Sequence, residues 1–334
     1  MNLEIRDVDR KIWEEELEGF VPKRIFDAHT HIFLAEHDLS QKADEGGPYS
    51  VPPLPQVDCP TLREVYSRLF PGRRVHSLLF GWVFRNVDFR SINAYVAEQA
   101  EGDRWSVPFM LVSPSMTPTE LAEGLDRGGF VGLKPYFYWS DKLWDAGILD
   151  ILPEALIEVA DERGLAVTLH LGKRDAIANR ENIDTLAHLT RTYPKVRWIL
   201  AHCARSLASW PLERAIERIK DLPNLWYDVS SVTDPYVYLL MLRHVPLDHI
   251  LYGSDIPSDL ERGKLVSFGY AWALLDEQTI SKMSIPHCDA EPTYVVYETL
   301  RAFRRAAHER GLDAPDTEKV FLHNALKLFA KDTD

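Results

Sequence analysis

The feature that most constrains the fold of this chain is a regular alternation of short apolar runs with amphipathic stretches. Strands that are buried on both faces read as continuous apolar runs, so the pattern predicts a parallel sheet. Eight such runs are present, at Arg24–Asp27, Val75–Trp82, Ser106–Val112, Val131–Lys134, Ala166–Leu171, Val196–Ala201, Leu225–Val229 and Ile250–Gly253.

The stretches between these runs have the apolar spacing of helices. Thr117 followed by Pro118 is typical of a helix start, and Gly164 is typical of a helix end. The predicted helices are Thr61–Leu69, Phe89–Glu101, Pro118–Arg127, Ile151–Arg163, Asn182–Tyr193, Leu212–Asp221 and Pro235–His244.

Eight strands, most of them followed by a helix, predict an α/β fold in which the sheet closes into a distorted (β/α)₈ TIM barrel. The main alternative is an open, doubly wound sheet. Such a sheet usually carries a glycine-rich phosphate-binding turn after its first strand, whereas this chain has Ala28-His29-Thr30-His31 there.

A barrel needs roughly 250 residues, and the chain has 334. We expect a single domain over residues 1–334, with the surplus in an N-terminal helical extension (about 1–22) and two loop insertions (about 36–60 and 257–293). Both insertions follow predicted strands, so they should lie as lids over the end of the barrel where the strands finish.

Composition excludes several classes of protein. The net charge of −13 and the shortness of the basic clusters, Arg73-Arg74, Lys173-Arg174 and Arg304-Arg305, argue against a nucleic-acid partner. No apolar run approaches the roughly 18 residues of a membrane span. Three cysteines, Cys59, Cys203 and Cys288, are too few for a disulfide framework, and the charged start 1–18 does not resemble a signal peptide. We therefore expect a cytoplasmic protein without a membrane partner.

His29 and His31, directly after the first apolar run, link a backbone conformation to a chemistry. Residues i and i+2 point to the same face only in an extended strand, so the pair can hold one metal ion at the end of a strand. Asp27 should share this face and support the ligands. Alone, a His-x-His pattern is weak.

The ends of three other predicted strands strengthen this interpretation. His170, His202 and Asp255 each follow an apolar run, at the position where barrel enzymes place their catalytic groups. Four strand ends that supply four histidines and a carboxylate form a specific constellation.

With these residues the chain resembles the amidohydrolase superfamily, most closely its amidohydrolase-2 (amidohydrolase-related) branch. The resemblance runs from about Arg24 to Phe329, and it implies one or two divalent metals, hydrolysis or non-oxidative decarboxylation of small carboxylated substrates, and a homodimer. The matching pieces are Asp27-Ala28-His29-Thr30-His31, Gly132-Leu133-Lys134-Pro135, His170, Ala201-His202, Gly253-Ser254-Asp255 and the tail from Phe321 to Phe329.

The residue chemistry agrees with these roles. His29, His31 and His170 offer neutral nitrogen ligands and Asp255 offers an oxygen, a set that suits Zn²⁺, with Mn²⁺ or Fe²⁺ as alternatives. Asp255 could take the proton of a metal-activated water and pass it to the leaving group. His202 could polarise the scissile carbonyl or hold the developing oxyanion.

Three roles are possible for Lys134. It could be carboxylated and bridge to a second metal, it could contact a carboxylate of the substrate, or it could be a structural residue. One metal ion is expected unless Lys134 is carboxylated. The remaining candidates for substrate binding are Tyr136, Tyr138, Arg174 and Arg205 in the loops after three of the strands.

The leading functional prediction is a metal-dependent hydrolase acting on a small carboxylated ester, lactone or amide. The alternative is a metal-dependent decarboxylase of an unsaturated or aromatic acid. Its relatives often continue the strand-1 motif into a proline-containing turn, whereas this chain continues Ile32-Phe33-Leu34. A non-catalytic metal-binding protein ranks third, because a degenerate site usually loses a ligand first.

Overall fold

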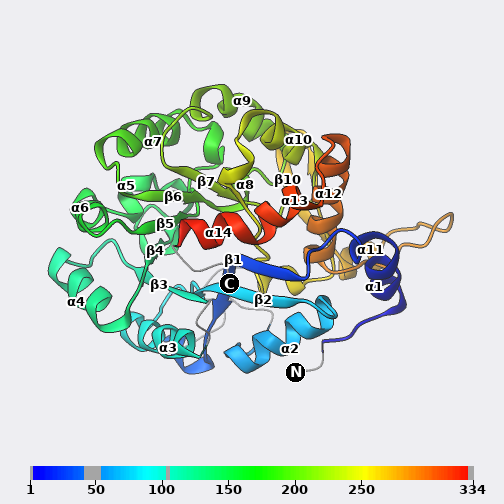
Figure 1. Ribbon diagram of the computed structural model, residues 1–334, viewed down its shortest axis with the longest axis horizontal. Helices are drawn as coiled ribbons and strands as arrows, with labels where there is room; N and C mark the ends of the chain where they lie inside the picture. Colours follow the sequence, from blue (N-terminus) through cyan, green and yellow to red (C-terminus); the bar gives the residue numbers. More distant parts are fainter. Residues whose placement is uncertain (1–2, 41–53, 103–105, 330–334) are drawn as a thin grey trace.

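The computed structural model describes residues 3–40, 54–102 and 106–329. Figure 1 shows a central barrel of strands surrounded by helices. The eight barrel strands are parallel and follow one another in chain order. They are β1 (Arg24–Ile32), β2 (Arg74–Gly81), β3 (Val107–Val112), β4 (Gly132–Pro135), β5 (Ala166–Leu169), β6 (Arg197–Leu200), β7 (Leu225–Asp228) and β8 (Ile250–Leu251).

Backbone hydrogen bonds between the first strand and the segment that begins at β8 close the barrel. Ala28 N donates to Tyr252 O at 2.8 Å, and His31 N donates to Ile256 O at 2.8 Å. The prediction of a distorted (β/α)₈ barrel is therefore confirmed. The first strand extends five residues beyond the predicted end at Asp27, so His29 and His31 do lie in extended backbone.

The helices lie outside the barrel (Figure 1). Several begin at a side chain that caps the first turn: Thr117 accepts from Glu120 N at 3.2 Å, as the sequence predicts for α4. They are α1 (Asp7–Ile12), α2 (Cys59–Leu69), α3 (Phe89–Glu101), α4 (Pro118–Gly128), α5 (Ile148–Ile151), α6 (Glu154–Glu162), α7 (Arg180–Thr192), α8 (Ala201–Arg205), α9 (Ser209–Ile219), α10 (Pro235–His244), α11 (Glu277–Ser281), α12 (Val295–Glu309), α13 (Ala314–Glu318) and α14 (Asn324–Leu328).

One predicted helix is wrong in its extent. The stretch Ile151–Arg163 is divided between α5 and α6 by Leu152 and Pro153. Proline has no N–H to donate and disfavours the helical conformation of the residue before it, so a single helix cannot run through this point. Gly164, with φ +61°, ends the second piece as predicted.

The barrel interior is closed at one end by aromatic packing. Phe329, directly after α14, lies 5.6 Å from Phe26 of β1 and 5.7 Å from Phe109 of β3, measured between ring centroids. Figure 1 shows α14 lying across the strands at this place. The strand ends that carry His29, His170, His202 and Asp255 belong to the opposite end.

Two segments outside the barrel matter for the site. The insertion after β8 forms an antiparallel hairpin of β9 (Gly263–Phe268) and β10 (Ala271–Asp276), followed by α11. The chain before β1 forms α1 and a wide helical turn at Trp13–Leu17. Most of the other predicted insertion (36–60) lies outside the described residues, and the single-domain organisation stays a prediction. Among the helices of the described residues, none has the length and apolar character to cross a membrane.

Candidate active site

A cleft of about 420 Å³ opens at the end of the barrel where the strands finish. Its inner lining comes from the strand ends and the residues directly after them. Its outer lining comes from the loop after β4 and from the β9–β10 hairpin. The polar residues that line its inner part are His29, His31, Lys134, His170, His202, Arg205, Ser231, Asp255 and Asp259.

His29 and His31, both on β1, each point their Nε2 atom toward Asp255. His31 Nδ1 lies 2.9 Å from Gly81 O, which can only accept, so this nitrogen carries the proton. His29 Nδ1 lies 2.9 Å from an oxygen of Asp228 and is protonated for the same reason. The Nε2 atoms of His29 and His31 are therefore acceptors, and they lie 3.4 and 3.3 Å from Asp255 Oδ1.

Three lone pairs that converge in this way repel one another unless a cation lies among them, either a metal ion or the ammonium of Lys134, whose Nζ is 3.1 Å from His29 Nε2. His29, His31 and Asp255 are indeed one of two groups of three potential ligands whose donor atoms lie within 4.8 Å of one another in the described part of the chain. Nitrogen and carboxylate donors of this kind fit a divalent transition metal. The residues present therefore fit the metal that the sequence predicts.

Electrostatics keep the donors in the states that a metal requires. Burial lowers the pKa of His29 and of His31, and the nearby Lys134 lowers both further. Burial alone would raise the pKa of Asp255, but positive charge on the surrounding rings of His29, His31 and His202 outweighs it and holds that pKa well below the usual range, and a bound cation would act in the same way. Neutral imidazoles and an ionised carboxylate result.

His170 lies beside this group without belonging to it. Its ring centroid is 5.1 Å from that of His202 and 4.9 Å from that of Tyr136. Its Nδ1 is buried and has no hydrogen-bond partner among the described residues. Burial, helped by His202, holds the pKa of His170 well below its ordinary value. A buried ring nitrogen without a hydrogen-bond partner suits a ligand, and the role of His170 as a metal ligand stays a prediction.

His202 sits at the start of an unusual turn. Residues His202–Arg205 of α8 all have positive φ, between 51° and 61°, so α8 is a left-handed turn without a glycine. Each such residue costs about 1–2 kcal/mol, and strain of this kind is found mainly at functional sites. The turn places both His202 and Arg205 in the lining of the cleft.

The hydrogen bonds of His202 fix its tautomer. Ser230 Oγ donates to Asp228 Oδ1 at 2.5 Å and so accepts from His202 Nδ1 at 2.8 Å. Burial lowers the pKa of His202 to about 4, so the ring is neutral at pH 7. Its Nε2 is then an acceptor, whereas the predicted role of polarising a carbonyl needs a donor.

Lys134 is fully enclosed at the centre of the site. Its Nζ lies 3.1 Å from His29 Nε2 and 4.4 Å from the centre of the Phe80 ring. Burial lowers the pKa of Lys134 to about 8, although Asp255 and Asp228 oppose the shift. An appreciable share of neutral amine is therefore present near neutral pH.

The structure separates the other predicted substrate residues. Tyr136 and Arg205 line the cleft, and Arg205 Cζ lies 5.2 Å from the ring centroid of Trp144 and 5.7 Å from that of Trp272. Tyr138 is buried behind Tyr136, with ring centroids 5.1 Å apart, and does not line the cleft.

Arg174 is exposed and likewise lies outside the lining. It follows β5 as predicted, but the backbone turns there: Lys173 and Ala176 both have positive φ.

The expectation that Asp27 shares a face of the strand with His29 and His31 is wrong. The register of β1 against β2 shifts between Asp27 and Thr30, which is a bulge. Asp27 instead accepts from Tyr66 of α2 at 3.0 Å and from Ser254 N at 2.9 Å. It fixes the strand from outside the cleft.

Asp228 was not among the predicted site residues, although it accepts hydrogen bonds from several of the groups that form the site. It receives His29 Nδ1–H, the Ser230 hydroxyl and His202 N (3.1 Å). Burial raises its pKa, but His29 and the other donors outweigh this and lower the pKa to about 2. A signal was present, because Asp228 is the penultimate residue of the seventh apolar run, Leu225–Val229, and Asp255 follows the eighth run. No sequence pattern marked Trp144, in the loop after β4, or Trp272, in the insertion after β8, as residues of the cleft.

A parallel barrel with imidazoles, a lysine and carboxylates gathered at its strand ends defines the class of metal-dependent barrel enzymes. The family comparison is more specific. The family model described as amidohydrolase matches residues 26–331, so the chain belongs to the amidohydrolase family and is an enzyme of that type. A search of the curated proteins found no match.

Solved structures share the fold at low sequence identity. A probable 2-pyrone-4,6-dicarboxylic acid hydrolase from Acinetobacter baumannii, with citric acid bound, is 15% identical (92% of this chain, 99% of that chain, TM-score 0.59). A 2,6-dihydroxybenzoate decarboxylase complexed with 2,6-dihydroxybenzoate is 16% identical (92% and 100%, TM-score 0.60). A 4-oxalomesaconate hydratase from Rhodopseudomonas palustris is 14% identical (92% and 95%, TM-score 0.51).

Proposed function

We propose that this enzyme is a metal-dependent hydrolase that directs an activated water at a small carboxylated ester, lactone or amide. The observation that carries the proposal is the convergence of His29 Nε2, His31 Nε2 and Asp255 Oδ1 in a cleft that also holds Lys134 and Arg205. The family and the fold of the hydrolase from Acinetobacter baumannii agree with it.

His29, His31 and Asp255 would hold the metal, with His170 as the fourth ligand that the sequence predicts. We propose one ion per chain, Zn²⁺ before Mn²⁺ or Fe²⁺, because nitrogen donors outnumber oxygen donors. Such a metal supplies a water whose pKa is lowered from 15.7 toward about 7.

The protein's own residues handle the proton. Asp255 is ionised, and its Oδ2 accepts from Ser231 Oγ at 3.1 Å, so the carboxylate is oriented, and we propose that it takes the water's proton. It would then pass that proton to the leaving group. Neutral His202 presents Nε2 as a second acceptor, so we propose that it orients the water or receives its proton.

Binding of the substrate carboxylate falls to the two enclosed cations. Lys134 and Arg205 line the cleft from β4 and α8, and both lie among aromatic rings that exclude water and strengthen the attraction. Tyr136 lines the cleft beside them. Tyr138 and Arg174 do not reach the lining, so they are not part of the proposal.

Aromatic walls favour decarboxylation as the second candidate. Trp82, Tyr136, Trp144 and Trp272 line the cleft and would bind a planar ring. The solved decarboxylase with 2,6-dihydroxybenzoate has the same fold. In that reaction the metal would orient the acid instead of activating water.

A substrate panel separates the two reactions. The purified enzyme, loaded with one metal at a time, is offered 2-pyrone-4,6-dicarboxylate, simple lactones and esters bearing a carboxylate, and 2,6-dihydroxybenzoate. Acid release without CO₂ supports the hydrolase, and CO₂ release supports the decarboxylase. If Asp255→Asn turned over substrate at the wild-type rate, neither mechanism would stand.

We also propose a cytoplasmic location and a homodimer. All three cysteines are among the described residues and none forms a disulfide, which is usual in a reducing compartment. The dimer rests on the family resemblance alone. Light scattering of the purified protein measures its mass, and a monomer at all concentrations would contradict the dimer.

A further inference from the structure

The β9–β10 hairpin forms one wall of the cleft. Leu265 of β9 and Trp272, Ala273, Leu274 and Asp276 of β10 all line it. Trp272 also covers one side of the Arg205 guanidinium. The position of this hairpin therefore decides the width of the cleft and the environment of Arg205, although the hairpin supplies none of the predicted metal ligands.

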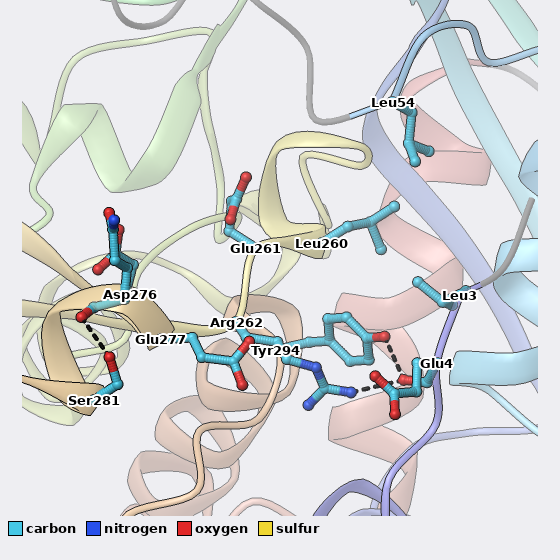
Figure 2. Close-up of a pocket in the computed structure, with 11 residues that line it drawn as sticks. Leu3, Glu4, Leu54, Leu260, Glu261, Arg262, Asp276, Glu277, Ser281 and Tyr294 are labelled. Carbon is cyan, nitrogen blue, oxygen red and sulfur yellow. Dashed lines mark hydrogen bonds between the residues drawn. The ribbon is translucent and has the colours of Figure 1, made fainter.

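Arg262 anchors the hairpin at the point where β9 begins. This residue directly precedes β9 and is 8% exposed. Its guanidinium donates to both carboxylate oxygens of Asp9, at 2.6 and 3.1 Å, to Glu4 O at 2.6 Å and to Pro292 O at 3.0 Å. Figure 2 shows Arg262 and the Tyr294 hydroxyl both reaching Glu4.

Asp9 joins both ends of the insertion to the N-terminal segment. It lies on α1, is fully buried, and accepts from Thr293 Oγ1 at 2.7 Å as well as from Arg262. A third link comes from Arg6, which forms an ion pair with Glu277 directly after β10. Residues 4–9 thus contact the chain before β9, after β10 and at the end of the insertion.

A buried ion pair is a poor way to gain stability, because desolvation of both charges offsets their attraction. Its advantage is geometric, since the bidentate contact of a guanidinium with a carboxylate allows one relative position and not its neighbours. An apolar contact would hold the two segments together without fixing the hairpin at one height over the cleft.

We propose that Asp9 is a positioning residue for the active site: through Arg262 it fixes the β9–β10 hairpin over the cleft, so the N-terminal segment sets substrate affinity. The proposal rests on the proposed function only in taking this cleft as the substrate site. It assigns to a segment outside the barrel a part in the enzyme's specificity.

The test compares Asp9→Asn with Leu17→Ala. Leu17 is a fully buried residue of the same N-terminal region, in the turn that follows α1, and it is not part of the Asp9–Arg262 ion pair. Both variants should lower Tm. Only Asp9→Asn should speed hydrogen exchange at residues 263–276 and raise KM, by about tenfold, the equivalent of one lost contact. Its kcat should stay within about twofold, and its metal content should not change.

The double variant Asp9→Leu with Arg262→Met covers the case in which Asp9→Asn does not fold. Removal of both charges avoids an unpaired buried ion. The variant should fold, exchange hydrogen faster at the hairpin and keep the raised KM. Equal hairpin exchange in wild type and in this variant, or a KM change shared with Leu17→Ala, would overturn the proposal.

Hydrogen exchange needs neither metal nor substrate, so it decides the anchoring even if the proposed function fails. The affinity measurement uses 2-pyrone-4,6-dicarboxylate or 2,6-dihydroxybenzoate, whichever the enzyme turns over. If neither is turned over, their binding is measured by calorimetry. If neither the metal-loaded wild type nor the variants turned over or bound these compounds, that result would count against the proposed function alone.

Discussion

At the scale of single residues, the site depends on which ring nitrogen of each histidine carries the proton. Gly81 O and Asp228 settle this for His31 and His29 through contacts of 2.9 Å. The sequence shows the histidines but not these partners, because Asp228 is 199 residues from His29 in the chain. Candidate ligands could thus be named from the strand ends, and their role stays a prediction, whereas the orientation of their rings could not be predicted.

Asp228→Asn should therefore weaken metal binding. An amide can turn either its oxygen or its nitrogen toward His29, so the ring loses its fixed orientation and part of its basicity. We expect affinity for Zn²⁺ to fall by about 10- to 100-fold, measured by competition with a chromophoric chelator. Asp184→Asn, an exposed carboxylate on α7, is the matched control and should bind as wild type. Equal affinities of the two variants would contradict the role of Asp228.

Lys134→Met tests the open readings of Lys134. The change keeps the apolar stem but removes the charge next to His29. If Lys134 binds the substrate, the metal content should remain one ion per chain while kcat/KM falls by about 10²-fold or more, because a preorganised cation in a dry site is lost. Metal analysis and steady-state kinetics give both numbers. Loss of a second ion, with bicarbonate dependence in wild type, would instead show a carboxylated bridge.

At the scale of elements, the strands followed from the sequence because their buried residues are contiguous in the chain. All eight apolar runs became barrel strands. The bulge in β1 and the left-handed turn α8 did not follow, since both depend on neighbouring strands. The sequence Ala201-His202-Cys203-Ala204 has no glycine to signal positive φ, so only the surrounding structure imposes it.

The strain in α8 predicts an unusual result for a glycine substitution. Ala204 has φ +61°, where glycine is at ease and alanine is not. Ala215, fully buried in the interior of α9, is the matched site with ordinary helical backbone. Ala204→Gly should cost less free energy of unfolding than Ala215→Gly, by about 1–2 kcal/mol. Urea denaturation measures the difference, and an equal cost would mean that α8 holds no such strain.

At the scale of the whole molecule, one end of the barrel is built for stability and the other for function. Phe26, Phe109 and Phe329 fill the first, while imidazoles, carboxylates and a buried lysine occupy the second. Composition and the strand–helix alternation predicted the barrel itself. They did not predict the hairpin wall or its link to Asp9, because Asp9 and Arg262 meet only in three dimensions, 253 residues apart.

Converging donors that repel one another make metal binding and folding interdependent. A metal that binds only the folded state stabilises it by RT ln(1 + [M]/Kd), about 2.7 kcal/mol at a hundredfold excess over Kd. We therefore expect chelation to lower Tm by several degrees and Zn²⁺ to restore it, as followed by scanning calorimetry. His31→Asn should lose this response, whereas His188→Asn, exposed on α7, should keep it. A Tm that chelator and Zn²⁺ leave unchanged in wild type would show that His29, His31 and Asp255 do not hold a metal.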